Sequence, residues 1–138
     1  MKAFIDTHVL IYWVDDSARA DVVEQLLAQQ SVVSVQVLNE FANVLRRKRA
    51  MRLEDIQTLC TTLTDTCEVV DLSLRTHQTA LALMDRYNLS VYDANIVAAA
   101  VLSGCTTLYS GDMQDGLNIK LPAPAKAHPL VIRNPFRA

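Results

Sequence analysis

The chain has 138 residues, of which 51% are apolar and 20% are charged, and its formal net charge is −2. This length and apolar content predict a single compact domain, residues 1–138, that buries a core of its own. The slightly negative charge excludes binding to nucleic acid or to an anionic membrane through overall charge, so any such partner requires a local basic patch.

Cysteine usage and the distribution of apolar residues indicate where the protein resides. Cys60, Cys67 and Cys105 show no paired spacing, and no His lies at zinc-finger spacing from them, so we expect reduced, buried thiols. The chain begins without a cleavable leader pattern, and its first apolar stretch is too short and too polar to cross a bilayer. These features predict a soluble cytoplasmic protein without membrane contact.

The first half of the chain alternates short apolar runs with stretches of helical periodicity. The run Ala3–Ile5 predicts a buried strand that ends at Asp6, and apolar residues at helical spacing then predict a helix through residue 14. A second helix is predicted from Ser17, a second strand over 31–35, and a third helix that ends in the basic cluster 46–49.

The second half continues this alternation. Helices are predicted over 53–66, 73–88 and 90–103, and strands over 68–72 and 106–110. An acidic turn follows over 111–116, and the proline-rich tail, 122–135, contains a possible edge strand over 130–133. Because parallel strands need crossover helices between them, the pattern predicts an α/β fold, a three-layer α/β/α sandwich with a mainly parallel central sheet.

Two acids follow strands of this predicted sheet. Asp6 comes directly after the first strand, and Asp112 lies two residues beyond the strand 106–110. Ligands of such sheets bind beyond the carboxyl ends of the strands. We therefore expect both carboxylates at the same end of the sheet.

Two further acids lie on predicted helices. Asp93 shares a helical face with apolar residues three, four and seven positions further on, so it faces inward, where an isolated charge is costly. Either it forms a capping box with Ser90 or it belongs to a site. Glu40 lies in mid-helix and belongs either to a solvated polar stripe or to the same site.

Four acids that converge at one end of a parallel sheet would repel one another unless a cation lay between them. Carboxylate oxygens without Cys or His at ligand spacing favour Mg²⁺ or Mn²⁺ over zinc. Such a site is suited to phosphodiester hydrolysis, because the ion activates water and offsets charge in the transition state. The sequence contains no Ser-His-Asp order and no P-loop, so metal-assisted phosphoryl chemistry is the predicted reaction class.

The segments around these acids resemble the motifs of a known family. They are FIDTHVLIYW, SVQVLNEFANVLRRK, LSVYDANIVAAA and LYSGDMQDG, in the order and spacing of the PIN domain. More closely, residues 2–136 are similar to the VapC-type toxins of bacterial toxin–antitoxin pairs. The resemblance implies an α/β/α fold and a Mg²⁺- or Mn²⁺-dependent endoribonuclease that hydrolyses RNA. It also implies a cognate antitoxin protein as a partner, and a homodimer.

The resemblance also implies a role for each acid. Asp6 and Asp93 would hold the metal directly, and Asp112 would hold it directly or through water. Glu40 would orient or deprotonate the attacking water. In this interpretation, Asp93 serves the site as well as its helix end, because a carboxylate has two oxygens.

Supporting residues and two departures follow from the same comparison. Thr7 and Ser110 stand where hydroxyl groups often brace the first and fourth acids, and Asp115 is a spare carboxylate nearby. His8 stands where Asn is commonest, and Gly111 stands where relatives often carry Glu. Loss of that Glu would weaken metal affinity or leave Asp115 to substitute for it.

Other residues have two interpretations each. Arg47 lies two turns beyond Glu40, in a basic cluster that either contacts RNA phosphates or is a solvated helix end. Tyr12 and Trp13 either contact RNA or an antitoxin, or pack in the core or a dimer interface. An apolar groove near Trp13 and the helix 53–66 is a hypothetical antitoxin contact, whereas His77 and His128 are expected to be ordinary surface residues.

Two other functions are compatible with the acids. A PIN-like module could bind RNA or protein without cutting it. Alternatively, Asp6 could accept a phosphoryl group, as in haloacid-dehalogenase-like proteins or receiver domains. The second alternative is disfavoured because His8 occupies the position where those folds need another acid.

Overall fold

The structure is a computed structural model that describes residues 2–15, 17–121 and 129–137. Its helices are α1 (Thr7–Asp15), α2 (Ser17–Leu27), α3 (Val35–Lys48), α4 (Leu53–Thr66), α5 (Leu74–Tyr87) and α6 (Val91–Leu102). Its strands are β1 (Ala3–Ile5), β2 (Ser31–Ser34), β3 (Glu68–Val70), β4 (Thr107–Tyr109), β5 (Asn118–Ile119) and β6 (Leu130–Arg133). The predicted alternation of strands and helices is confirmed.

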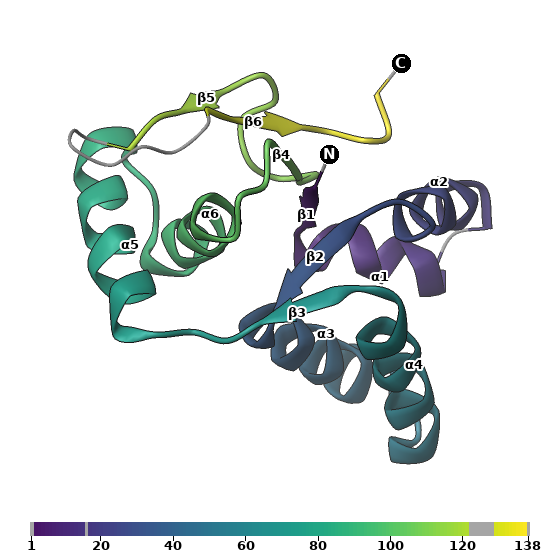
Figure 1. Ribbon diagram of the computed structural model, residues 1–138. Coiled ribbons are helices and arrows are strands. Elements are labelled where there is room, and N and C mark those ends of the chain that lie inside the picture. Colours follow the sequence, from purple (N-terminus) through teal and green to yellow (C-terminus); the bar gives the residue numbers. More distant parts are fainter. Residues whose placement is uncertain (1, 16, 122–128, 138) are drawn as a thin grey trace.

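The described strands form one sheet in the order β3-β2-β1-β4-β6-β5. All neighbours are parallel except β5 and β6, which pair antiparallel. Helices α5 and α6 lie on one side of the sheet and α1 and α2 on the other (Figure 1). The predicted three-layer α/β/α sandwich with a mainly parallel sheet is confirmed.

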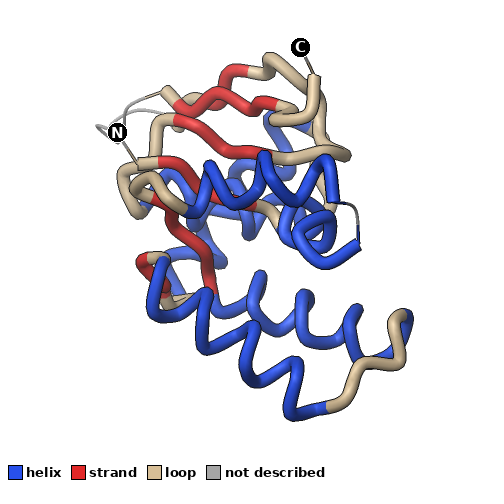
Figure 2. Tube along the Cα trace, turned by 90° about the vertical axis from the view of Figure 1, so that its right-hand side faces the viewer, coloured by secondary structure: helices blue, strands red, loops and turns tan. Residues whose placement is uncertain are grey.

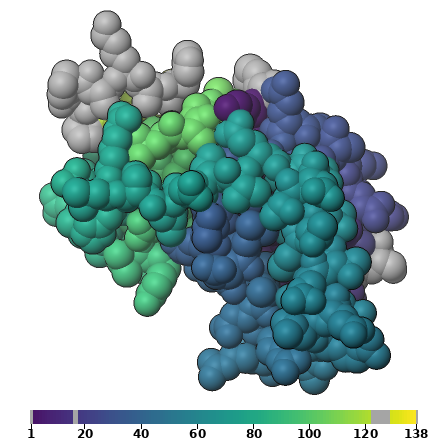
Figure 3. Space-filling model, turned by 60° about the horizontal axis from the view of Figure 1, so that its bottom comes forward, coloured from purple at the N-terminus to yellow at the C-terminus, as the bar shows by residue number. Residues whose placement is uncertain are grey.

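Helices α3 and α4 pack against each other and extend beyond the sheet (Figure 2). Seen from below, they form a lobe beside the one made by α5 and α6 (Figure 3). Helix α3 also packs against α1, which places its middle beside the carboxyl end of β1.

The core is centred on β1, β2 and α6. Phe4 in β1 and Val33 in β2 are fully buried, and α6 is buried along most of its length, from Ile96 to Val101. The alanines at 98–100 let this helix pack closely against β2 and β4. Each fully buried Val, Ile or Leu contributes about 1.5–3 kcal/mol, so this packing holds the carboxyl ends of the strands in place.

Polar residues define the helix ends near the sheet. The Ser34 side chain accepts a hydrogen bond from the Val37 N–H at 3.3 Å, which caps α3 directly at the end of β2. Asn88 ends α5 in the left-handed conformation, at φ 53°, and Gly104 has a φ of +81° just after α6. The predicted helix stops at Asn88 and Gly104 are thus confirmed.

The prediction of an edge strand over 130–133 is wrong in one respect. The strand β6 forms there, but it lies between β4 and β5. Pro129 and Pro135 lie outside the strand, so they remove no ladder hydrogen bond and β6 can pair on both sides. The predicted strands 31–35, 68–72 and 106–110 are each shorter than expected, and residues 122–128 of the proline-rich tail lie outside the described residues.

The three cysteines are free thiols, as predicted, with Cys67 and Cys105 buried and Cys60 half-buried. Burial raises the pKa of each thiol, so all three remain protonated near neutral pH. Within the described ranges, none of the helices has the length and apolar character needed to span a bilayer.

Candidate active site

Asp6 is held rigidly at the carboxyl end of β1. Asp6 is only 3% exposed, and its backbone N–H donates to the Tyr109 carbonyl at 2.9 Å, which extends the pairing of β1 with β4. The Thr7 N–H donates to Asp6 Oδ1 at 2.7 Å, and the Ser110 hydroxyl lies 2.9 Å from Asp6 Oδ2. The carboxylate therefore has a fixed orientation.

Asp112 reaches the same place from the turn after β4. The Ser110 hydroxyl lies 3.0 Å from Asp112 Oδ1, so it contacts the carboxylates of both Asp6 and Asp112. A hydroxyl carries a single proton and can donate to only one of them at a time. The other oxygen of Asp112 lies 2.8 Å from His8 Nδ1. The prediction that Asp6 and Asp112 share one end of the sheet is confirmed.

Glu40 lies on the side of α3 that faces α1. The Thr7 hydroxyl donates to its Oε2 at 2.8 Å, and the Gln36 amide donates to its Oε1 at 2.8 Å. The same amide lies 3.3 Å from the Tyr92 carbonyl in the first turn of α6. Both oxygens of Glu40 are thus engaged, and Gln36 joins α3 to the helix that carries Asp93.

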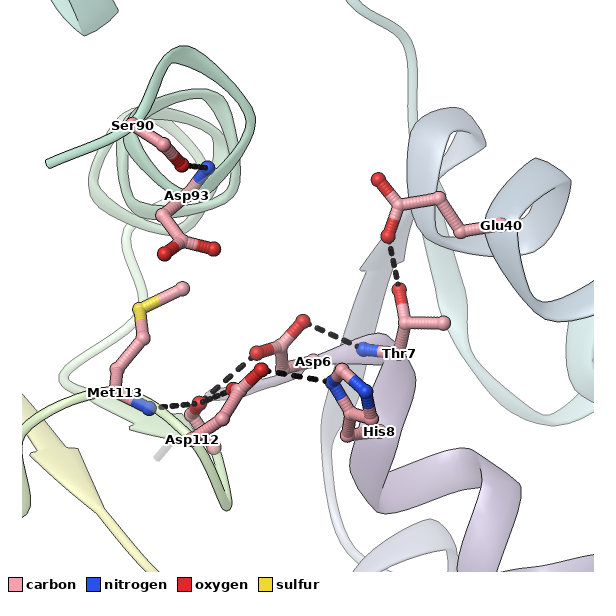
Figure 4. A network of polar contacts seen from close by, with 9 residues as sticks. Asp6, Thr7, His8, Glu40, Ser90, Asp93, Asp112 and Met113 are labelled. Atoms are coloured by element: carbon pink, nitrogen blue, oxygen red, sulfur yellow. Dashed lines mark hydrogen bonds and ion pairs between the residues drawn. The ribbon is translucent and has the colours of Figure 1, made fainter. Parts of the chain in front are cut away.

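Asp93 lies in the first turn of α6, and its carboxylate is directed toward Asp6 and Asp112 (Figure 4). The Ser90 hydroxyl accepts a hydrogen bond from the Asp93 N–H at 3.2 Å, so Ser90 is the N-cap, as predicted. A complete capping box would also contain a bond from the Ser90 N–H back to the Asp93 side chain. Within the described residues, this bond is not formed. The capping box is therefore only half formed, although a contact with the Ser90 side chain still lowers the pKa of Asp93.

The electrostatics of the cluster reflect burial and like charge. Burial, followed by the nearby charge of Asp112, raises the pKa of Asp6 from 3.8 to about 7. Burial also raises the pKa of Asp93, with the charges of Asp112 and Glu40 as the next causes. The charge of Asp112 therefore makes ionisation of Asp6 and Asp93 more costly, and that of Glu40 adds to the cost at Asp93. A bound cation would remove this cost.

Comparison with known proteins identifies the family. A family model described as the PIN domain matches residues 3–115. The chain belongs to the PIN domain family. This match spans β1 through the turn that carries Asp112, so it includes all the elements of the acid cluster, and the resemblance seen in the sequence is confirmed.

Solved structures show the same fold at low sequence identity. A toxin–antitoxin complex from Klebsiella pneumoniae matches with a TM-score of 0.73 at 20% identity, over 99% of each chain. VapC20 of Mycobacterium tuberculosis, a toxin that cleaves the sarcin–ricin loop, has a TM-score of 0.64 at 20% identity, over 80% of this chain and 89% of that one. VapBC2 of Rickettsia felis, bound to a DNA fragment of its promoter, has a TM-score of 0.60 at 18% identity, over 80% and 87%. The chain has no significant match among curated proteins.

The donor set of this PIN domain fits a hard divalent ion. Asp6, Glu40, Asp93 and Asp112 offer only carboxylate oxygens, which Mg²⁺ and Mn²⁺ prefer. In the described part of the chain, no three acidic, His or Cys side chains are already arranged as a coordination group. Ser110, His8 and Gln36 each contact an oxygen of these carboxylates. Ion binding would exchange some of these contacts for bonds to the metal.

The supporting residues of the PIN domain divide into two groups. Ser110 contacts both Asp6 and Asp112, whereas the Thr7 hydroxyl contacts Glu40 and only its backbone contacts Asp6. Asp115 lies apart from these contacts, because its carboxylate accepts a hydrogen bond from the Asn134 N–H at 2.9 Å and lies near Arg137.

The aromatic and basic candidates lie around the site. Trp13 stacks on Phe41 with ring centroids 6.4 Å apart, and Tyr12 meets Phe136 edge-on at 5.0 Å, which favours their interpretation as packing residues. Arg47 is exposed on α3, and His77 is exposed on α5, whereas His128 lies outside the described residues.

Two contacts of the site were not predicted. Gln36 orients Glu40, and His8 contacts Asp112. A signal for Gln36 exists in the sequence, because it precedes Glu40 by four residues and so lies on the same helical face. No such signal links His8 to Asp112, because the two meet only through the pairing of β1 with β4.

Proposed function

We propose that this PIN domain is a metal-dependent endoribonuclease and the toxin of a toxin–antitoxin pair. The observation that carries the proposal is the convergence of the carboxylates of Asp6, Glu40, Asp93 and Asp112 on one space at the carboxyl end of the sheet (Figure 4). The PIN family match and the similarity in fold to VapC toxins support it. The alternative of a binding module without activity offers no reason to hold the buried Asp6 beside three other acids.

In this proposal, Asp6 and Asp93 would hold Mg²⁺ or Mn²⁺ directly, and Asp112 would do so directly or through water. When bound, the ion would lower the pKa of a water molecule and offset charge on the phosphate. Glu40 receives the proton of the attacking water or orients it, while Thr7 and Gln36 hold both oxygens of Glu40 in place. Ser110 keeps Asp6 and Asp112 at a fixed separation.

The proposed partners are RNA as the substrate and an antitoxin as the inhibitor, with a homodimer as the assembly and the cytoplasm as the location. The Klebsiella pneumoniae complex supports an antitoxin partner, because its fold matches this chain over 99% of both lengths. The groove hypothesis near Trp13 and α4 remains a proposal for this contact. It predicts that an antitoxin without its C-terminal segment loses affinity.

The test is RNA cleavage by the purified chain. Total bacterial RNA is incubated with Mg²⁺ or Mn²⁺, or with EDTA, and cleavage ends are sequenced. Asp6→Asn and Asp93→Asn each reduce the cleavage rate about 100-fold or more, because each removes a metal ligand worth several kcal/mol. Circular dichroism confirms that both variants are folded.

The matched control is Asp71→Asn, which changes an exposed aspartate outside the cluster and leaves cleavage unchanged. Undiminished cleavage in Asp6→Asn and Asp93→Asn, or equal cleavage in EDTA, would reject the proposal. Calorimetric binding of Mg²⁺ without any cleavage would favour the non-catalytic module instead.

A further inference from the structure

A cavity of about 300 Å³ opens between α1 and α3, directly beside the acid cluster. Its near end is lined by Thr7, His8 and Glu40, which belong to the cluster. Its volume lies at the lower end of the range for small-ligand pockets. The cavity is therefore continuous with the proposed metal site rather than a separate feature.

The far end of the cavity is basic. It is lined there by Lys48, the last residue of α3, and by Arg49. The Arg49 guanidinium is already engaged, because its Nε donates to Asp15 Oδ1 at 2.8 Å and holds the pKa of Asp15 below its ordinary value. Lys48 is exposed and has no ion pair within the described residues, so its charge is available to an anion.

The wall between the two ends combines apolar and amide groups. Ile11 of α1 and Val44 of α3 supply the apolar surface. Asn43 lies beside them, exposed, and its side chain makes no hydrogen bond in the described part of the chain. An amide carries both donors and acceptors and can pair with the edge of a nucleobase, while apolar side chains contact its face.

The charge pattern suits a nucleic acid strand more than a protein segment or a small anion. Glu40 and Lys48 are eight residues apart on α3, which is about 12 Å along the helix axis. A stacked strand covers that length with about three to four nucleotides, at about 3.4 Å per nucleotide. A phosphate held at the acid cluster by a metal and another phosphate at Lys48 would therefore belong to neighbouring parts of one strand.

We propose that this cavity binds the single-stranded RNA segment that flanks the scissile phosphate. Lys48 contacts a backbone phosphate of the segment, and Asn43 contacts the edge of a base that packs against Ile11 and Val44. The inference rests on the proposed function and adds a specificity residue, Asn43, and a positioning charge, Lys48. Arg47, which the sequence singled out, is not among the residues that line the cavity.

Binding can be measured separately from cleavage. The probe is a fluorescein-labelled, mixed-sequence, single-stranded 12-nucleotide RNA in EDTA, followed by fluorescence anisotropy at several salt concentrations. Lys48→Ala weakens binding about fivefold to tenfold, and it lowers the slope of log affinity against log salt by about 0.7, the value for one phosphate contact on a single strand. Lys120→Ala, which removes another exposed lysine, leaves both quantities unchanged.

Asn43 is tested with labelled oligo(A), oligo(C) and oligo(U) of the same length. Asn43→Ala changes the order of affinity among the three, whereas Lys48→Ala lowers all three by a similar factor, because phosphate contacts carry no base information. Asn39→Ala is the matched control, since Asn39 is exposed on the same helix and does not line the cavity.

The outcomes separate this inference from the proposed function. If the wild type cleaves RNA but Lys48→Ala and Asn43→Ala behave like their controls, the inference fails and the nuclease stands. Equal affinity for a 12-base-pair RNA duplex also overturns the assignment to a single strand. If the wild type neither binds the probe nor cleaves RNA, both proposals fail.

Discussion

The two ends of the parallel sheet carry charge in opposite ways. At the amino end of the strands, Lys2 Nζ lies 3.1 Å from Glu68 Oε1 and 3.4 Å from the Ser103 carbonyl. Lys2 and Glu68 thus form an ion pair at the surface. At the carboxyl end, two acids, Asp6 and Asp112, share a single hydroxyl group, that of Ser110.

The difference lies in what each end contributes to stability, and it supports the site proposed at the carboxyl end. An exposed ion pair such as Lys2–Glu68 needs no other group and contributes up to about 1 kcal/mol. A buried, ionised acid beside other acids lowers the stability of the protein, and either protonation at low pH or a bound cation offsets that cost. The carboxyl end thus resembles a binding site whose ligand is part of its charge balance.

The largest expected effect is the pH dependence of stability that the buried Asp6 carboxylate causes. The pKa of Asp6 is raised from 3.8 in an ordinary environment to about 7 in the fold. Between these values the unfolded chain releases a proton that the folded chain keeps, so the contribution of Asp6 to stability is full below pH 3.8 and is lost as the pH rises to about 7. At 1.36 kcal/mol per pKa unit, the loss is at most about 4 kcal/mol.

Asp6→Asn removes this loss. Its amide can keep the Thr7 contact and donate to Ser110, so in EDTA the variant becomes more stable than the wild type as the pH rises from 4 to 8. Urea denaturation at each pH measures the difference. Mg²⁺ at a concentration 100 times the Kd raises the free energy of unfolding of the wild type by about 2.7 kcal/mol. It leaves the free energy of unfolding of the variant unchanged. If the free energy of unfolding depends on pH in the same way in both proteins in EDTA, ionised Asp6 does not lower stability and the comparison of the two ends of the sheet fails.

A smaller effect is expected from a residue that acts through Glu40. Gln36→Ala removes the hydrogen bond to Glu40 Oε1, so Glu40 retains only its contact with Thr7. We expect kcat for RNA cleavage to fall about tenfold while KM is unchanged, in the range typical of residues that orient a catalytic group. Asn39→Ala on the same helix is the control. A rise in KM at constant kcat would instead place Gln36 in substrate binding.

The smallest effect is expected at the opposite end of the sheet. Lys2→Ala removes the ion pair with Glu68. The side chains of Lys2 and Glu68 are 42% and 48% exposed. We expect the free energy of unfolding to fall by less than about 1 kcal/mol and the cleavage rate to stay unchanged. Thermal unfolding and the RNA assay measure the two quantities. A change in cleavage would show that the two ends of the sheet are coupled.

Local patterns predicted most of the elements and failed where a strand lacks such a pattern. The run Ala3–Ile5 predicts its strand and Asn88 predicts the end of its helix, because both signals depend on the residues themselves. The two-residue strand Asn118–Ile119 has no periodicity to detect, and without it β6 was expected at the edge. In the site, the positions of Asp6 and Asp112 after two parallel strands predict that they lie together. No pattern in the sequence predicts the contact of His8 with Asp112.

The sequence by itself determined the α/β alternation, the order of the acids and their likeness to the PIN family, because these follow from spacing along the chain. Only the tertiary structure decided that Gln36 and Thr7 hold Glu40, that Ser110 contacts both Asp6 and Asp112, and that a cavity leads from the acids to Lys48. The physical reason is that these relations join different elements. Their geometry depends on how the strands pair and the helices pack, and no local segment contains that information.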